Sequence, residues 1–144
     1  MRCIKRSVAL FAMLLVSTMM LWADETIALN AQDYGDGTEV TSVSGTACTV
    51  TFDKGTGVNV PKYYTTGSAI RFYGGNSFTV SSSGANITKV EMTFGSGDGS
   101  NTITASPGTF TSPTWTGSAS SITFTIGGTT GHRRISKLVI TLAE

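Results

Sequence analysis

The sequence predicts an all-β protein folded as a β-sandwich, with about eight to ten short antiparallel strands joined by jelly-roll or Greek-key connections. Three observations lead to this prediction. Apolar and polar residues alternate with a period of two in several short stretches, glycine-rich turns separate these stretches, and no stretch after the N-terminal apolar run shows a helical period. Threonine and serine fill the polar positions, as expected for the solvent face of strands.

An N-terminal segment resembling a secretory signal precedes this pattern. Three basic residues open the chain, and an almost unbroken apolar run then continues to Leu21. The run has the length of a signal-peptide core and is short for a membrane-spanning anchor, which is the alternative. We therefore predict a signal peptide over residues 1–23 and a single domain over residues 24–144. The mature protein should be secreted or held at the cell surface, without membrane insertion.

Four segments of the predicted domain alternate most regularly, and each should bury one face of a strand. In the first of them, Phe78 and Val80 alternate with Ser77 and Thr79. The other three regular segments are residues 89–94, 122–126 and 137–142. Weaker strand candidates are residues 26–31, 39–44, 48–53, 69–73, 101–105 and 108–115.

Two of these regions resemble each other. Residues 78–94 and 124–142 both read Phe-Thr-aliphatic, then a polar loop, then Ile-Ser/Thr-Lys followed by alternating apolar residues. Two copies are too few for a solenoid, so we interpret them as a pair of strands used twice in equivalent places. Arg133 and Arg134 are expected in the loop of the second copy, and loops on a rigid scaffold often carry function.

Charge and cysteine content narrow the function. Without Arg2, Lys5 and Arg6 of the predicted signal, seven Lys and Arg remain against nine Asp and Glu, a net charge of about −2. This balance lacks the basic face that a nucleic-acid partner requires. Cys48 is then the only cysteine. We interpret it as a small buried residue, with a reactive thiol as the alternative.

No catalytic arrangement emerges, and we expect neither enzymatic activity nor a cofactor. His132 is the only histidine, two arginines follow it, and no serine lies in a Gly-x-Ser-x-Gly motif. Carboxylates cluster in residues 33–39 and, with Ser and Asn, in residues 98–101, where oxygen ligands could suit calcium. Neither stretch matches a calcium-loop pattern, and Asp-Gly turns explain both, so we predict no metal site.

The segment 62–75 supplies most of the residues that we predict to bind a ligand. Alternation turns Ile70 and Phe72 inward, so the two residues that alternate with them should be exposed side by side. The adjacent tyrosines that precede this strand should point in opposite directions, and the sequence leaves open which one is exposed. Stacking of such side chains against a sheet, with no ligand, is the alternative. The predicted ligand-binding residues are Tyr63, Tyr64, Arg71, Tyr73, Asn76 and Arg133.

Nearly all of residues 26–142 resembles a small all-β module of secreted Gram-negative bacterial proteins. The resemblance is carried by the stretches DYGDGTEVTSV, VTFDKGTG, PKYYTTGSAIRFYGGNSFTVSSS, ITKVEMTFGSGDGSNTITA and TWTGSASSITFTIGGTTGHRRISKLVITL. It implies a jelly-roll-like sandwich with an adhesion or glycan-binding role, and it supplies no catalytic residues. We therefore expect a secreted, non-catalytic binding or adhesion module whose favoured ligand is a glycan and whose partner is a polysaccharide or a cell-surface protein. The alternative is a structural or protein-interaction subunit of the cell envelope that associates through strand edges.

Overall fold

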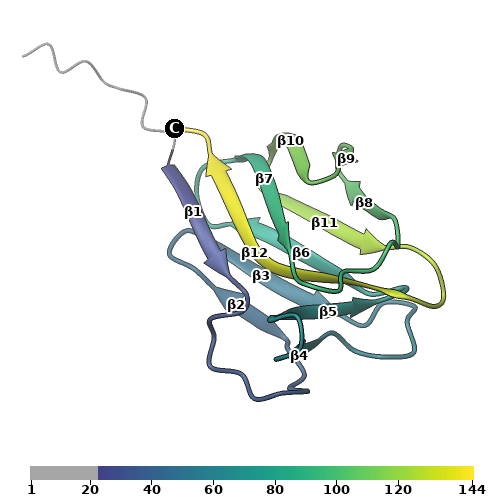
Figure 1. The fold of residues 1–144 in the computed structure, drawn as a ribbon. Coiled ribbons are helices and arrows are strands. Elements are labelled where there is room, and N and C mark those ends of the chain that lie inside the picture. Colours follow the sequence, from purple (N-terminus) through teal and green to yellow (C-terminus); the bar gives the residue numbers. More distant parts are fainter. Residues whose placement is uncertain (1–22) are drawn as a thin grey trace, which may run out of the picture.

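The computed structural model describes residues 23–144, which form two antiparallel β-sheets packed face to face around one core (Figure 1). The predicted all-β sandwich is confirmed, with twelve strands instead of eight to ten. One extra strand, Lys62–Tyr64, is too short for alternation to reveal. The other arises because the predicted segment 108–115 forms parts of two strands, Phe110–Thr111 and one that begins at Thr114. The predicted signal peptide lies outside the described residues except for Ala23, which begins the first strand.

The larger sheet has seven strands and the smaller one five. In the larger sheet β1 (Ala23–Ala28) pairs with the second half of β12. The other strands follow the order β4 (Lys62–Tyr64), β5 (Ala69–Tyr73), β12 (His132–Leu142), β7 (Ile87–Phe94), β10 (Thr114–Ala119) and β9 (Phe110–Thr111). The smaller sheet follows the order β2 (Ser42–Ser44), β3 (Cys48–Asp53), β6 (Ser77–Ser82), β11 (Ser121–Ile126) and β8 (Ile103–Ser106).

The strands from β5 onward are wound as a jelly roll. Successive strands β5, β6, β7 and β8 alternate between the two sheets, and β10, β11 and β12 return by the same alternation. As a result β5 pairs with β12, β6 with β11 and β7 with β10, like one long hairpin wrapped around the core. This winding places β5 beside the C-terminal strand, although the two are far apart in the sequence.

The internal resemblance has a structural counterpart. Each copy is a pair of strands that crosses from the smaller to the larger sheet, β6–β7 in the first copy and β11–β12 in the second. The copies are antiparallel neighbours, with Phe78 opposite Phe124, Val90 opposite Ile140 and Met92 opposite Leu138. These pairings are those of an approximate two-fold relation between the copies. The interpretation as equivalently placed strand pairs is therefore confirmed.

A line of phenylalanines joins the two sheets through the core. Phe72 of the larger sheet lies 4.9 Å, between ring centroids, from Phe78 of the smaller one, and Phe78 stacks on Phe124 at 5.0 Å. Phe52 and Phe110 extend the line at its two ends, at 5.7 and 5.8 Å. Aromatic pairs at these distances add to the free energy gained by burying their area. Ile70 and Phe72 point inward, as alternation predicts.

Strand β12 begins earlier than the sequence predicts. Arg133 and Arg134 were expected in a loop, but they lie within the strand, opposite Phe72 and Arg71 of β5. A bulge at Ser136 shifts the register against β7, and the Ser136 hydroxyl donates to the carbonyl of Thr93. The sequence did not predict this early start, because the first residues of β12 are polar and the alternation of apolar residues begins only after the bulge.

Candidate functional site

The ends of three neighbouring strands bring six polar and aromatic side chains onto the outer face of the larger sheet. Residues directly opposite each other in antiparallel strands share a face, and here Tyr73 lies opposite His132 while Arg71 lies between Lys62 and Arg134. Tyr64 follows Lys62 by two residues and therefore points the same way. All six side chains are half-buried. We call this surface the tyrosine–arginine platform: Lys62, Tyr64, Arg71, Tyr73, His132 and Arg134.

The two tyrosines of the platform hold Arg71 between them. Their hydroxyl oxygens are 3.0 Å apart, so one hydroxyl donates to the other. The Arg71 guanidinium lies 5.8 Å from the centroid of the Tyr64 ring and 5.2 Å from that of Tyr73, within cation–π range. Burial, followed by the hydrogen bond with Tyr64, raises the pKa of Tyr73. Both effects keep the Tyr73 phenol neutral at physiological pH.

His132 fixes the other side of the Arg71 guanidinium. Its Nδ1 lies 3.1 Å from Nη2 of Arg71, and its Nε2 lies 3.2 Å from the carbonyl oxygen of Gly97. Because a guanidinium only donates, Nδ1 must accept, and the ring hydrogen sits on Nε2 and points to Gly97. Both ring nitrogens are thereby used to position the platform, and no carboxylate of residues 23–144 orients the ring as in a catalytic triad.

Arg134 lies between two loops that border the platform. Its Nη1 donates to the carbonyl of Ser96 at 2.7 Å, in the loop after β7. On the other side Gly67, in the turn between β4 and β5, approaches so closely that an added Cβ would lie 3.1 Å from Cδ of Arg134. The Nε atoms of Arg71 and Arg134 are buried and have no hydrogen-bond partner within the described chain.

The other three predicted ligand-binding residues are not part of the platform. Tyr63 is the inward tyrosine of its pair, and its ring packs against Tyr34 at 5.9 Å between centroids. Asn76 is fully buried and holds three backbone groups. Arg133 points to the opposite face of the sheet, where its guanidinium lies 4.4 Å from the centroid of the Phe94 ring and pairs with Asp98. The structure therefore brings together Tyr64, Arg71 and Tyr73 only.

Sequence reasoning missed Lys62, His132 and Arg134 as members of this surface. Lys62 had a usable signal, because it lies two residues from Tyr64 on one short extended stretch. His132 and Arg134 had none, because their position depends on how β12 pairs with β5. That register is a property of the whole winding and cannot be read from either strand alone.

The carboxylates of Asp36 and Asp53 have structural partners. Asp36 accepts hydrogen bonds from the backbone N–H and the hydroxyl of Thr65, and Asp53 caps the turn at Gly55. Within residues 23–144, no three His, Cys, Asp or Glu side chains are grouped to hold a metal ion. The same residues include no helix long and apolar enough to cross a membrane.

Native Cys48 is expected to resist alkylation at about pH 8. Its side chain is buried, and burial, followed by the charge of Glu25, raises the pKa of the thiol to about 12. Treatment with iodoacetamide and peptide mass mapping should therefore leave the Cys48 peptide unmodified in buffer and modified in urea. Rapid labelling in buffer would instead identify an accessible, reactive thiol.

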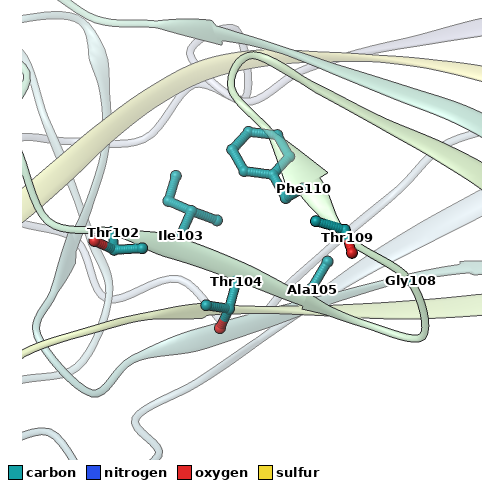
Figure 2. A pocket seen from close by; sticks show the side chains of 7 residues that line it. All are labelled: Thr102, Ile103, Thr104, Ala105, Gly108, Thr109 and Phe110. Atoms are coloured by element: carbon teal, nitrogen blue, oxygen red, sulfur yellow. The ribbon is translucent and has the colours of Figure 1, made fainter.

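A small groove lies at the opposite edge of the sandwich from β4. It runs between β8 and β9, has a volume of about 300 Å³ and is lined only by uncharged residues. Figure 2 shows the side chains of Ile103 and Phe110 turned toward this space. Phe110 also packs edge-on against Phe124 of the core. With few polar groups and no charge, the groove offers little to orient a polar ligand.

The fold and the platform define a jelly-roll β-sandwich with a polar-aromatic surface at one corner of its larger sheet. Comparison of the chain with protein-family models, curated proteins and solved structures finds no match. The resemblance to modules of secreted bacterial proteins therefore stays a prediction, and functional inference rests on the geometry of the platform.

Proposed function

We propose that this protein is a non-catalytic binding module that takes a glycan on the tyrosine–arginine platform. The observation that supports the proposal is the convergence of Tyr64, Arg71 and Tyr73 on one outward surface. Sugar rings present apolar C–H faces to aromatic side chains and hydroxyl groups to fixed polar groups. Each tyrosine is half-buried, so part of each ring stays accessible to a ligand.

The platform is held in one arrangement before any ligand arrives. The tyrosine rings and His132 restrain Arg71, while the carbonyls of Ser96 and Gly97 restrain Arg134 and His132. Ordering a flexible arginine on binding costs about 0.5–1.5 kcal/mol, and a restrained one avoids most of that cost. The arrangement thus suits a shallow site that must bind without enclosing its ligand.

Export of the module by a signal peptide is part of the same proposal. The basic start and the apolar run of residues 1–23 support it, as does the resemblance to secreted bacterial modules. A secreted or surface-held protein would meet extracellular polysaccharides or glycosylated surface proteins. Glycan binding and export are therefore consistent with each other.

Replacing Tyr73 with Ala should weaken glycan binding at least about tenfold, because stacking area and the restraint on Arg71 are lost together. Isothermal titration against a panel of soluble polysaccharides measures this, with Tyr64→Ala as a second platform variant. Thr51→Ala is the control, because Thr51 is exposed on β3 of the smaller sheet, away from the platform, and its truncation should leave the affinity unchanged.

The same samples separate the proposal from its alternative, a structural or protein-interaction subunit. Strands β2 and β8 end the smaller sheet, and terminal strands offer unpaired backbone groups to a partner strand. Strand β4 is different, because its backbone pairs with residues 37–40. Concentration-dependent oligomers without any glycan binding would favour the alternative and contradict the platform.

A further inference from the structure

Three cations stand in a row across the tyrosine–arginine platform. Lys62 of β4 is directly opposite Arg71 of β5, and Arg71 is directly opposite Arg134 of β12. Neighbouring strands lie about 4.8 Å apart, so the row spans roughly 10 Å. Like charges directly opposite each other destabilise a sheet. A row of three therefore needs an explanation other than stability.

No carboxylate of residues 23–144 forms an ion pair with this row. The two ion pairs within residues 23–144 join Lys89 to Glu91 and Arg133 to Asp98, both away from the row. Two of the nearby carboxylates are already used, since Asp36 binds Thr65, and Asp98 binds Arg133 and the backbone N–H of Arg134. Glu39 lies opposite Lys62 at the outer end of the row, on the side away from Arg71 and Arg134, and forms no ion pair among the described residues. Residues 1–22 contain no Asp or Glu that could supply a partner.

The two arginines keep free donors on the outer side. Within the described chain, Nη1 of Arg71 and Nη2 of Arg134 make no hydrogen bond, and neither atom is buried. Their Nε atoms are buried, so water cannot supply the hydrogen bonds that these atoms lack. An anion above the row would accept from these Nη donors and offset the repulsion between the charges.

We propose that the platform is selective for an acidic glycan, a sugar chain bearing carboxylate or sulfate groups, with one anionic group bound between Arg71 and Arg134. This inference rests on the proposed glycan-binding function and names the class of ligand. The predicted mature chain is net negative, at about −2, so it has no general attraction for polyanions. Selectivity would then come from the local row and from stacking of the sugar ring on the tyrosines.

Matched pairs of oligosaccharides test this proposal by titration calorimetry. Oligogalacturonate is compared with its methyl ester for carboxylate, and a κ-carrageenan oligosaccharide with its desulfated form for sulfate. At least one acidic member should bind about tenfold or more tightly than its neutral partner, with an affinity that falls as salt rises. The double variant Arg71→Gln/Arg134→Gln should lose that preference and keep its melting temperature, because the relieved repulsion offsets the contacts that the two guanidinium groups lose. The control is Lys137→Gln, which removes a charge from the outer face of β12 beyond the row.

The possible outcomes separate the two proposals. Equal, Tyr73-dependent affinity for acidic and neutral sugars would overturn the acidic selectivity and leave the glycan-binding function standing. Binding to none of the sugars, acidic or neutral, would overturn both. An acidic preference that persists in the double variant would place the anion elsewhere. Equal affinity for a single-stranded DNA oligonucleotide would show attraction by charge alone and would also overturn selectivity for a sugar.

Discussion

Replacing Asp98 with Ala is expected to lower the free energy of unfolding by about 3 kcal/mol. The carboxylate accepts from Nε and Nη2 of Arg133 at 3.0–3.1 Å and from the backbone N–H of Arg134 at 2.7 Å. The side chains of Asp98 and Arg133 are only 19% and 12% exposed, so solvent replaces little of what is lost. Denaturation with urea, followed by circular dichroism, measures the change.

A double-mutant cycle separates the ion pair from the rest of the loss. Arg133→Met removes the guanidinium and keeps a long side chain against Phe94. The double variant should lose less free energy of unfolding than the sum of the losses in the two single variants, with a coupling energy of about 1–3 kcal/mol. Asp33→Asn is the control for the loss of one negative charge in Asp98→Ala. Asp33 is exposed, and its φ of 57° is tolerated by Asn, so it should change stability by less than about 0.5 kcal/mol.

Asp98 also links the two faces of the larger sheet. It binds Arg133 on the inner side and the backbone of Arg134, whose own side chain lies on the platform. Its loop supplies the carbonyls of Ser96 and Gly97 that hold Arg134 and His132. Folded Asp98→Ala should therefore bind glycan more weakly, although no atom of Asp98 is proposed to touch the ligand. Unchanged affinity would show that the platform does not depend on this loop.

Alternation predicted the parts of the fold that depend on single strands. It turned Ile70 and Phe72 inward and left Arg71 and Tyr73 outward, because a strand has a period of two. It likewise identified the buried phenylalanine at the start of each resembling copy, Phe78 and Phe124. These inferences needed only neighbouring residues, which is why they agree with the structure.

The cationic row could not be predicted, because it is made by pairing between distant strands. Arg71 and Arg134 meet only when β12 lies beside β5, and that follows from the complete winding. Arg133 was predicted to bind the ligand from the loop of the second resembling copy. The register of β12 placed Arg134 on the platform instead, and a shift of one residue exchanges the two faces of a strand.

Asn76 shows the same limit for a buried polar residue. A polar amide after a Gly-Gly turn suggested a ligand contact, as sugar hydroxyls favour such groups. The structure buries it completely, between the turn after β5 and the loop of residues 54–59. The loop passes so close that a Cβ added to Gly57 would lie 2.6 Å from the Asn76 amide nitrogen. The partners of the Asn76 side chain are backbone groups, two of them in this loop, and their position depends on how the loop packs.

Asn76→Ala is expected to destabilise the protein by about 3 kcal/mol. Its Oδ1 accepts from the backbone N–H of Tyr73 at 2.8 Å, and its Nδ2 donates to the carbonyls of Lys54 and Asn59 at 2.9 and 2.7 Å. Alanine would leave three backbone groups without partners in a site that is fully buried. The matched control is Asn86→Ala, because Asn86 is exposed and its amide makes one bond, to Ser118. Urea denaturation compares the two variants.

Asn76→Asp distinguishes two roles for Asn76, which are holding the backbone in place and contacting the ligand. Aspartate keeps the shape and the acceptor for Tyr73 but turns a carboxylate oxygen toward the carbonyls of Lys54 and Asn59, so it should destabilise at least as much as alanine. Because the amide is fully buried, no ligand reaches it, and Asn76→Asp, which keeps the acceptor for Tyr73, should bind glycan in proportion to its folded fraction. Lost affinity in fully folded Asn76→Asp would mean that the loop opens on binding and that Asn76 meets the ligand directly.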